Sequence, residues 1–278
     1  MKKLLAILAH PDDEGAFAGT LAHYAQHDTE VALICATKGE AGEISDPALA
    51  TPENLGEVRT AELEAACALI GIQRLHFLGY RDSGMEGTPP NEDPRALVQA
   101  DPAEAIGRLV GLMRQLKPDV VITFEPFGWY GHPDHKAVYR LATAAYQQVG
   151  DAAAYPQAGP PWQPQGLFYA VMPVSKFKLI ADYAAAHDLE AFSGFEIQDF
   201  QLETEAQITH ILDIAPLVET KQQAMHRHQT QFGENNIFRK LPPDIMRQMW
   251  SHEYFIQVDP PPAEALKSHP ATDLFAGL

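Results

Sequence analysis

Short runs of apolar residues recur along this 278-residue chain, and longer segments with helical periodicity separate them. The runs occupy residues 4–9, 31–37, 75–78, 120–124 and 167–172. Because they are continuously apolar rather than alternating, they are typical of strands buried on both faces, as in a parallel sheet. This repeat of strand, helix and strand predicts an α/β fold. We expect a Rossmann-like, mostly parallel sheet flanked by helices, with the active site at the carboxyl ends of the strands.

Two of the intervening segments carry signals for helix ends. Thr51 is placed to cap the start of one helix, and Gly71 to end it. Asp101, with Glu104 three residues later, is placed to cap the start of another helix. The chain is 46% hydrophobic, which is enough for a large core, and we expect residues 1–278 to form a single domain.

The second half of the chain is less regular. Residues 174–187 have helical periodicity, and residues 208–214 and 254–258 resemble strands. Two stretches with several prolines, residues 79–100 and 150–166, are predicted to be loops rather than linkers between domains. Loops of this length are either binding or lid elements or plain surface insertions.

The net charge and the cysteines limit the partners and the compartment. A formal net charge of -17 repels nucleic-acid phosphates and anionic membrane surfaces, so we expect neither as a partner. No apolar stretch approaches the ~20 residues of a membrane span, and the run at residues 4–9 is too short for a signal peptide. Cys35 and Cys67 lie in apolar runs, which indicates buried thiols rather than a disulfide. We therefore expect a cytoplasmic protein that acts on a small molecule.

A cluster of polar residues directly follows the first apolar run. Residues 9–14 read Ala-His-Pro-Asp-Asp-Glu. The run places His10, Asp12, Asp13 and Glu14 where an α/β fold builds its site. Solvated loop charges would account for any one of them alone, but their concentration after a buried strand favours a metal-binding or catalytic role. The same loop has no Gly-x-Gly-x-x-Gly pattern, which argues against a nicotinamide enzyme.

A second cluster follows the fourth apolar run. Residues 129–135 read Trp-Tyr-Gly-His-Pro-Asp-His, and helical periodicity resumes at Lys136. His132 and His135 are three residues apart, so near a helix start both rings can face a common point. Two histidines with this spacing, taken alone, often lie on the surface without a functional role. Two such clusters at one edge of one sheet favour a metal site.

The residue types in the two clusters suit hydrolysis. Two imidazoles and a carboxylate bind Zn²⁺ and leave a position for water, whose pKa falls towards about 7. Adjacent Asp12 and Asp13 project in different directions, so one can bind the metal while the other takes a proton from water. Zn²⁺ is the favoured cofactor, and Fe²⁺ is the alternative for the same ligand types.

At these clusters the sequence resembles the LmbE-like, or phosphatidylinositol-glycan class L (PIG-L), family of zinc-dependent N-deacetylases. This family includes the N-acetylglucosaminyl deacetylases of mycothiol and bacillithiol biosynthesis. The resemblance covers roughly the first half of the chain and rests on residues 9–14, 37–43, 78–85 and 131–135, and on Arg59 with Glu62. Lys221 with Ala224 and residues 228–231 look like the family's last motif.

The resemblance implies roles for the residues nearest the metal. It implies that His10, Asp13 and His135 hold zinc, and that Asp12 is the general base that activates water. It further implies that the reaction is hydrolysis of a linear amide, with loss of an acetyl group from an N-acetylglucosaminyl compound.

Four further residues gain roles from the same resemblance. It implies that His132 and Tyr130 stabilise the oxyanion or protonate the departing amine. It also implies that Arg59 and Asp82 contact the sugar. Members of the family are often oligomers, so a homo-oligomer is a further expectation.

We expect the residues that determine substrate specificity to lie in the second half of the chain, where the family varies most. In and after the loop at residues 150–166, Trp162, Phe168 and Tyr169 are candidates for an aromatic wall against a sugar face. Ordinary packing is the competing interpretation, and the one we favour for Phe168 and Tyr169. His228 is left open between a role beside the metal ligands and a structural role.

Two other functions compete with deacetylation. A thiol S-conjugate amidase would use the same metal centre on a larger acyl group. A non-catalytic carbohydrate-binding protein with a structural metal is the second rival. Asp12 argues against the second rival, because a structural site has no need of an unligated carboxylate beside its ligands.

Overall fold

Residues 1–189 and 205–278 are described by the structure, a computed structural model of the chain. Within them, seven strands form one sheet in the order β3-β2-β1-β4-β5-β7-β6. The strands are β1 (Lys2–Leu8), β2 (Thr29–Cys35), β3 (Arg74–Phe77), β4 (Val120–Phe124), β5 (Gly166–Val171), β6 (His210–Asp213) and β7 (His252–Asp259). The first five in the sheet order are parallel, whereas β7 is antiparallel to both β5 and β6. The predicted α/β fold with a mostly parallel sheet is confirmed.

The central strands are buried along almost their whole length. Leu4 of β1 pairs with Val31 of β2 on one side and with Val120 of β4 on the other. All five residues of β4 are buried. Strands covered on both faces need apolar side chains in both directions, which explains the continuous apolar runs in the sequence.

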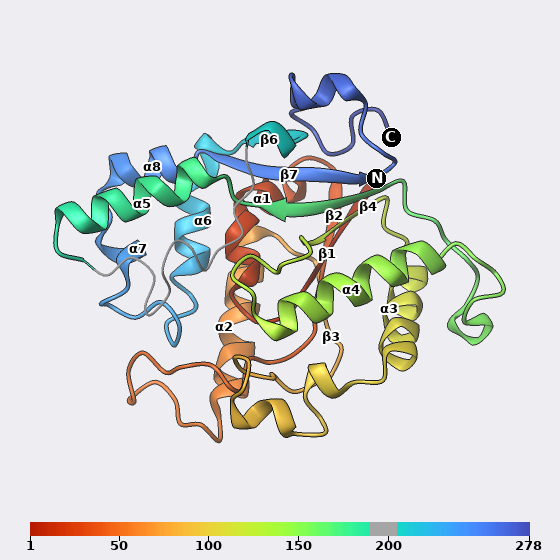
Figure 1. Ribbon diagram of the computed structural model, residues 1–278, viewed down its shortest axis with the longest axis horizontal. Helices are drawn as coiled ribbons and strands as arrows, with labels where there is room; N and C mark the ends of the chain where they lie inside the picture. Colours follow the sequence, from red (N-terminus) through yellow and green to blue (C-terminus); the bar gives the residue numbers. More distant parts are fainter. Residues whose placement is uncertain (190–204) are drawn as a thin grey trace.

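Helices cover both faces of the sheet (Figure 1). One side carries α3 (Pro102–Leu116) and α4 (Pro133–Gln148), and the other carries α1 (Ala18–Ala25), α2 (Leu55–Ile70) and α6 (Val218–Met225). Three more helices gather beside α6: α5 (Val174–Ala186), α7 (Ile237–Lys240) and α8 (Pro243–Trp250). No helix in the described ranges is both long and apolar enough to cross a bilayer.

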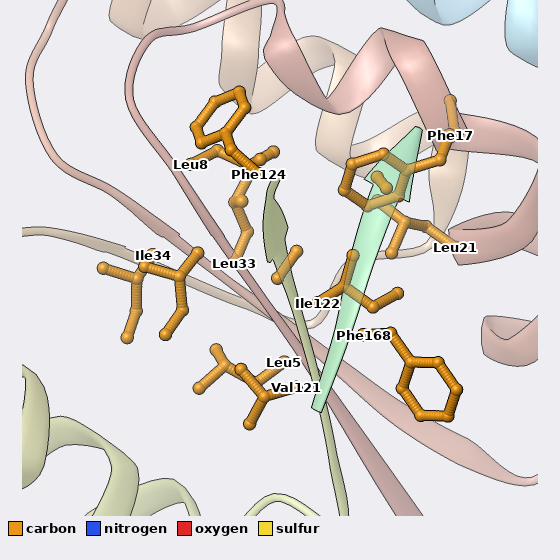
Figure 2. Close-up of a cluster of buried hydrophobic side chains, with 14 of the residues drawn as sticks. Leu5, Leu8, Phe17, Leu21, Leu33, Ile34, Val121, Ile122, Phe124 and Phe168 are labelled. Carbon is orange, nitrogen blue, oxygen red and sulfur yellow. The ribbon is translucent and has the colours of Figure 1, made fainter. Parts of the chain in front are cut away.

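The core consists of side chains from the central strands and the helices that cover them (Figure 2). Leu5 lies beside Val121, its partner in the register of β1 and β4. Phe17 and Leu21, which come directly after the first cluster of polar residues, are buried in the same core. The loop after β1 is therefore anchored on both sides, by the strand before it and by these core residues after it.

Most of the predicted helix ends are confirmed. The carboxylate of Asp101 accepts a hydrogen bond of 2.9 Å from the backbone N–H of Glu104, as expected for the cap of α3. Gly71 ends α2 with a positive φ of 90°. The predicted start of α2 at Thr51 is wrong. The N–H of Thr51 donates to the side chain of Asn54 in a turn, and the helix begins at Leu55.

The strand order reverses between β1 and β4. The chain passes from β1 to β2 on one side, whereas β4 lies against the other side of β1. In open parallel sheets, such a reversal leaves a crevice beyond the carboxyl ends of the two neighbouring strands. The loops that carry both clusters of polar residues begin at these two strand ends.

The Pro-rich loop at residues 150–166 lies at the amino ends of the strands, opposite the carboxyl ends from which the two polar clusters begin. The indole N–H of Trp162 donates to the carbonyl of Pro118, two residues before the start of β4. The expectation that Trp162 forms a wall beside the substrate is therefore wrong. Phe168 is buried in the core, and the hydroxyl of Tyr169 pairs with Thr143, so packing accounts for both aromatic residues.

Candidate metal centre

The loops that leave β1 and β4 bring two histidines together. Nδ1 of His10 lies 3.3 Å from Nε2 of His135, although the two residues are 125 positions apart in the chain. His135 is fully buried, and His10 is 6% exposed. The structure thus brings together the two clusters that the sequence places after separate strands.

Asp13 joins this pair from the loop after β1. Its Oδ1 lies 3.2 Å from Nε2 of His135, and its Oδ2 lies 3.8 Å from Nδ1 of His10. Oδ2 also accepts hydrogen bonds from the backbone N–H groups of Ala9 and His10. Burial opposes ionisation, but His135 and His10 together lower the pKa of Asp13 below its usual value. A carboxylate and two imidazoles therefore face one point.

The other nitrogen of each imidazole lies against an oxygen that can act only as a hydrogen-bond acceptor. Nδ1 of His135 lies 3.3 Å from the carbonyl of Gly128, and Nε2 of His10 lies 3.1 Å from the Asp134 carboxylate. With the protons on these outer nitrogens, each ring offers the lone pair of its inner nitrogen to a ligand. At this distance the two inner nitrogens need a proton or a metal ion between them, since two lone pairs would repel each other.

The donor set fits a small divalent metal ion. Ligand bonds of about 2.0–2.1 Å in tetrahedral geometry separate the ligand atoms by about 3.3 Å. The contacts of His135 with His10 and with Asp13 are 3.3 and 3.2 Å. Burial works against protonation of His10, but Asp82, Asp134 and Asp13 raise its pKa well above the usual value. This excess of negative charge also favours a cation.

His132 belongs to the same cluster and begins α4. One ring nitrogen from each of His10, His132 and His135 lies within 4.8 Å of the others. Nδ1 of His132 accepts a hydrogen bond of 3.1 Å from the N–H of Asp134, so His132 is the cap of the helix. Burial, with help from the two neighbouring imidazoles, lowers the pKa of His132 to about 2. The neutral ring therefore carries its proton on Nε2 and offers a hydrogen-bond donor to the site.

Asp12 has an unusual backbone conformation beside the cluster. Its φ is 112°, in the left-handed region that non-glycine residues rarely adopt. Its carboxylate is 20% exposed and lies 3.3 Å from the guanidinium of Arg59. Burial raises the pKa of Asp12 to about 6, although Arg59 works in the opposite direction. A carboxyl group with this pKa can exchange protons near neutral pH.

Arg59 and Asp82, the predicted sugar contacts, are both buried, each with an exposed fraction of 3%. The guanidinium of Arg59 donates to the carbonyls of Gly39 and Pro11 as well as facing Asp12. Asp82 lies 3.5 Å from Nε2 of His10 and accepts from backbone N–H groups. These contacts hold the loops around the site, and contact with a sugar stays a prediction for both residues.

A pocket of about 620 Å³ opens beside the cluster. Asp12, Asp13 and Tyr130 are among its lining residues, and burial raises the pKa of Tyr130 well above the usual value. The rest of the lining is mainly apolar and comes largely from α5, α6, α7 and α8, with Phe177, Ile180, Met225, Phe238 and Trp250 among these residues. Trp129 and Tyr130 come from the second cluster, whereas Phe177, Phe238 and Trp250 come from parts of the chain that the sequence does not single out as site residues.

Three buried residues to which the sequence assigns no specific role support this arrangement. Asp134 bonds to His10, and Glu14 lies 2.6 Å from His228; all three carry no exposed surface. Asp134 and Glu14 lie inside the two clusters, so their position after a strand is a signal for them. His228 lies in the run that resembles the family's last motif, but its pairing with Glu14, 214 residues away, leaves no local pattern.

Comparison with known proteins gives a consistent result. Residues 5–146 match the PIG-L family, described as GlcNAc-PI de-N-acetylase. The 1D-myo-inositol 2-acetamido-2-deoxy-alpha-D-glucopyranoside deacetylase 1 of Catenulispora acidiphila is 35% identical over 290 residues, which cover 100% of this chain and 90% of that protein.

Solved structures show the same fold at lower identity. The N,N'-diacetylchitobiose deacetylase of Pyrococcus horikoshii has a TM-score of 0.63 and 21% identity, covering 92% of this chain and 84% of that one. The 4-carboxy-2-hydroxymuconate hydratase of Pseudomonas putida has a TM-score of 0.64 and 17% identity, covering 95% of this chain and 98% of that one. Because a deacetylase and a hydratase share this fold, the function has to be argued from the site.

Proposed function

Because the chain belongs to the PIG-L family of de-N-acetylases, we propose that it is a zinc-dependent hydrolase that removes the acetyl group from an N-acetylglucosaminyl compound. The observation that carries this proposal is the meeting of His10, Asp13 and His135 at distances of 3.2 to 3.8 Å. These three side chains are the proposed ligands. A bound Zn²⁺ supplies Lewis-acid chemistry, in that it polarises a carbonyl group and lowers the pKa of water.

Asp12 is the proposed general base. It stands next to the proposed ligand Asp13 in the sequence, lines the pocket, and has a pKa raised to about 6 by burial. It takes a proton from the water that attacks the acetamide carbonyl carbon. Arg59 keeps the carboxylate available for this step, because a guanidinium at 3.3 Å favours the ionised form.

His132 and Tyr130 are the proposed donors to the developing oxyanion. Nε2 of His132 carries the proton of the neutral ring, since Nδ1 accepts from the N–H of Asp134. The hydroxyl of Tyr130 keeps its proton at neutral pH, because burial raises its pKa. Such preorganised donors stabilise negative charge where it develops in the transition state, and either can protonate the departing amine.

The proposed substrate class follows the relatives. The Catenulispora protein is named for a 2-acetamido-2-deoxy-glucopyranoside of inositol, and the match to it extends over this whole chain. We propose a small amino-sugar substrate of that kind, such as an N-acetylglucosaminyl inositol or malate. A panel of substrates that differ in the group attached to the sugar would identify the preferred one.

One observation favours a second candidate, a thiol S-conjugate amidase. The apolar walls of the pocket have room for an acyl group larger than acetyl. Such an amidase would use the same ligands and the same base, and it would release a mercapturic acid instead of acetate.

A substrate panel tests both candidates. The purified protein is assayed for free amine on N-acetylglucosaminides with different attached groups and on a thiol S-conjugate amide. Each assay is run before chelation, after chelation, and after zinc is returned. We expect acetate release that chelation abolishes and zinc restores. Release of mercapturic acid without acetate would favour the amidase, and no release from any substrate would contradict both candidates.

A further inference from the structure

Glu14 and His228 form a buried pair that the proposed reaction does not use. Nε2 of His228 lies 2.6 Å from Oε1 of Glu14, and neither side chain is exposed. Nδ1 of His228 has no hydrogen-bond partner among residues 1–189 and 205–278. The contact with Glu14 is therefore the interaction that orients the ring.

The second carboxylate oxygen of Glu14 contacts the backbone of Asp12, the proposed base. Oε2 accepts a hydrogen bond of 3.0 Å from the backbone N–H of Asp12. Asp12 is a non-glycine residue with a φ of 112°, a conformation that costs free energy and persists only where the surroundings enforce it. Glu14 is thus placed to hold the backbone of Asp12, and His228 is placed to hold Glu14.

The segment that carries His228 is itself fixed against the loops of the site. The N–H and hydroxyl of Thr230 donate to the carboxylate of Glu62 on α2. The N–H of Ser45 donates to the carbonyl of Thr230, and the hydroxyl of Ser45 donates to the carbonyl of Gln229. With these bonds on the residues that follow it, the backbone of His228 cannot move away from Glu14 without breaking them.

We propose that His228 is a positioning residue, which acts through Glu14 to hold Asp12 in the conformation from which its carboxylate works as a base. The inference rests on the proposed function of Asp12. A merely structural role would have His228 fill space in the core, and an apolar side chain of similar size would then serve equally well. The short contact with Glu14 separates the two possibilities, since only a hydrogen-bond donor can replace it.

Three variants test the proposal. His228→Leu removes the donor and keeps an apolar side chain of similar size, whereas His228→Gln returns an N–H donor near the position of Nε2. His226→Leu is the matched control, because His226 lies two residues away and its Nε2 has no hydrogen-bond partner in the described part of the chain. For each variant we would measure kcat, KM, bound metal, and hydrogen exchange at the Asp12 amide by NMR.

We expect His228→Leu to lower kcat by about 10- to 100-fold, the usual range for residues that orient the groups of a metal site without touching the metal. KM and metal content should stay near their original values, and the Asp12 amide should exchange at least about tenfold faster. His228→Gln should recover most of kcat and of the protection, and His226→Leu should match the original protein. If His228→Leu does not fold, His228→Asn replaces it, since its shorter side chain cannot reach Glu14.

Unchanged exchange at Asp12, unchanged kcat, or a loss of metal in proportion to kcat would overturn the proposal. The exchange measurement needs no substrate, so it decides the inference even if the substrate panel shows no hydrolysis. In that case the proposed function fails, while the link from His228 to the Asp12 backbone is judged on its own.

Discussion

Oδ2 of Asp134 lies 3.1 Å from Nε2 of His10, and both side chains are buried. The same oxygen accepts a hydrogen bond of 3.0 Å from the backbone N–H of Ser83, in the loop that follows β3. Asp134, in the first turn of α4, therefore joins the loops after β1 and β3 to the start of this helix at one atom. It also fixes which nitrogen of His10 faces Asp13 and His135, so it governs the ligand set without being part of it.

Replacing Asp134 with alanine should weaken metal binding. Without the carboxylate, His10 can rotate or place its proton on Nδ1, and we expect the Kd for Zn²⁺ to rise about 10- to 100-fold. Competition with a chelating dye measures the change. Asp134→Asn is the control, because its amide oxygen can still accept from Nε2 and the rise should be smaller. An unchanged Kd in Asp134→Ala would remove Asp134 from this role.

Replacing Asp12 with asparagine should separate metal binding from hydrolysis. The amide cannot take a proton from water, and loss of a general base costs about 10²- to 10⁴-fold in rate. Asp12 is not among the proposed ligands, so metal content by mass spectrometry should stay at one ion per chain. Hydrolysis at the original rate would show that another group is the base.

The parts of the fold that could be predicted from the sequence are those set by local pattern. β1, β2 and β4 appear as continuous apolar runs because both of their faces are covered. The two polar clusters could be assigned to one site because parallel strands end at one edge of the sheet. Within these clusters the resemblance to the PIG-L family implies that His10, Asp13 and His135 are the ligands, and the structure places them within 3.8 Å of one another.

The remaining features depend on partners far away in the chain. Whether the Pro-rich loop at residues 150–166 is a lid or an insertion is decided by Arg114, which is buried on α3. Its guanidinium donates to the carbonyls of Val149, Asp151, Ala154, Tyr155 and Gly159 and so fixes the loop at the far edge of the sheet. The link between Glu14 and His228 spans 214 residues and leaves no local pattern.

Replacing Arg59 should move the pH dependence of the reaction if the arginine acts on Asp12. Arg59 lowers the pKa of Asp12 against the raising effect of burial, so its removal should raise that pKa. The base works only when ionised, and the acidic limb of kcat/KM in Arg59→Gln should therefore move to higher pH by about one unit. Arg59→Lys keeps the positive charge and should leave the acidic limb of the pH profile of kcat/KM unchanged. A higher KM with an unmoved limb would instead support the predicted contact with the sugar.

Replacing Trp162 should affect stability and leave substrate binding alone. Its indole N–H bonds to Pro118 at 2.7 Å, and its ring lies 5.8 Å from the ammonium of Lys117, at the edge of the sheet opposite the metal centre. We expect Trp162→Ala to lower the free energy of unfolding by about 1–3 kcal/mol. KM should stay within about twofold of the original value, the control being Trp162→Phe, which keeps most of the packing. A large rise in KM would show that the loop at residues 150–166 contributes to substrate binding.

Replacing His132 should lower turnover by removing a donor to the oxyanion, but the residue has two functions that must be separated. Nδ1 caps α4 through the N–H of Asp134, and Nε2 carries the proton offered to the substrate. His132→Ala removes both, so we expect a loss of about 10²- to 10³-fold in kcat and about 1 kcal/mol in stability. His132→Asn restores the cap, because its side-chain oxygen can accept from Asp134 in place of Nδ1, whereas its amide N–H groups do not extend as far as Nε2. The asparagine variant should therefore recover the melting temperature while kcat stays low, as measured by calorimetry and by initial rates at saturating substrate. If kcat recovers together with the melting temperature, the helix cap accounts for the whole effect and His132 is not the oxyanion donor.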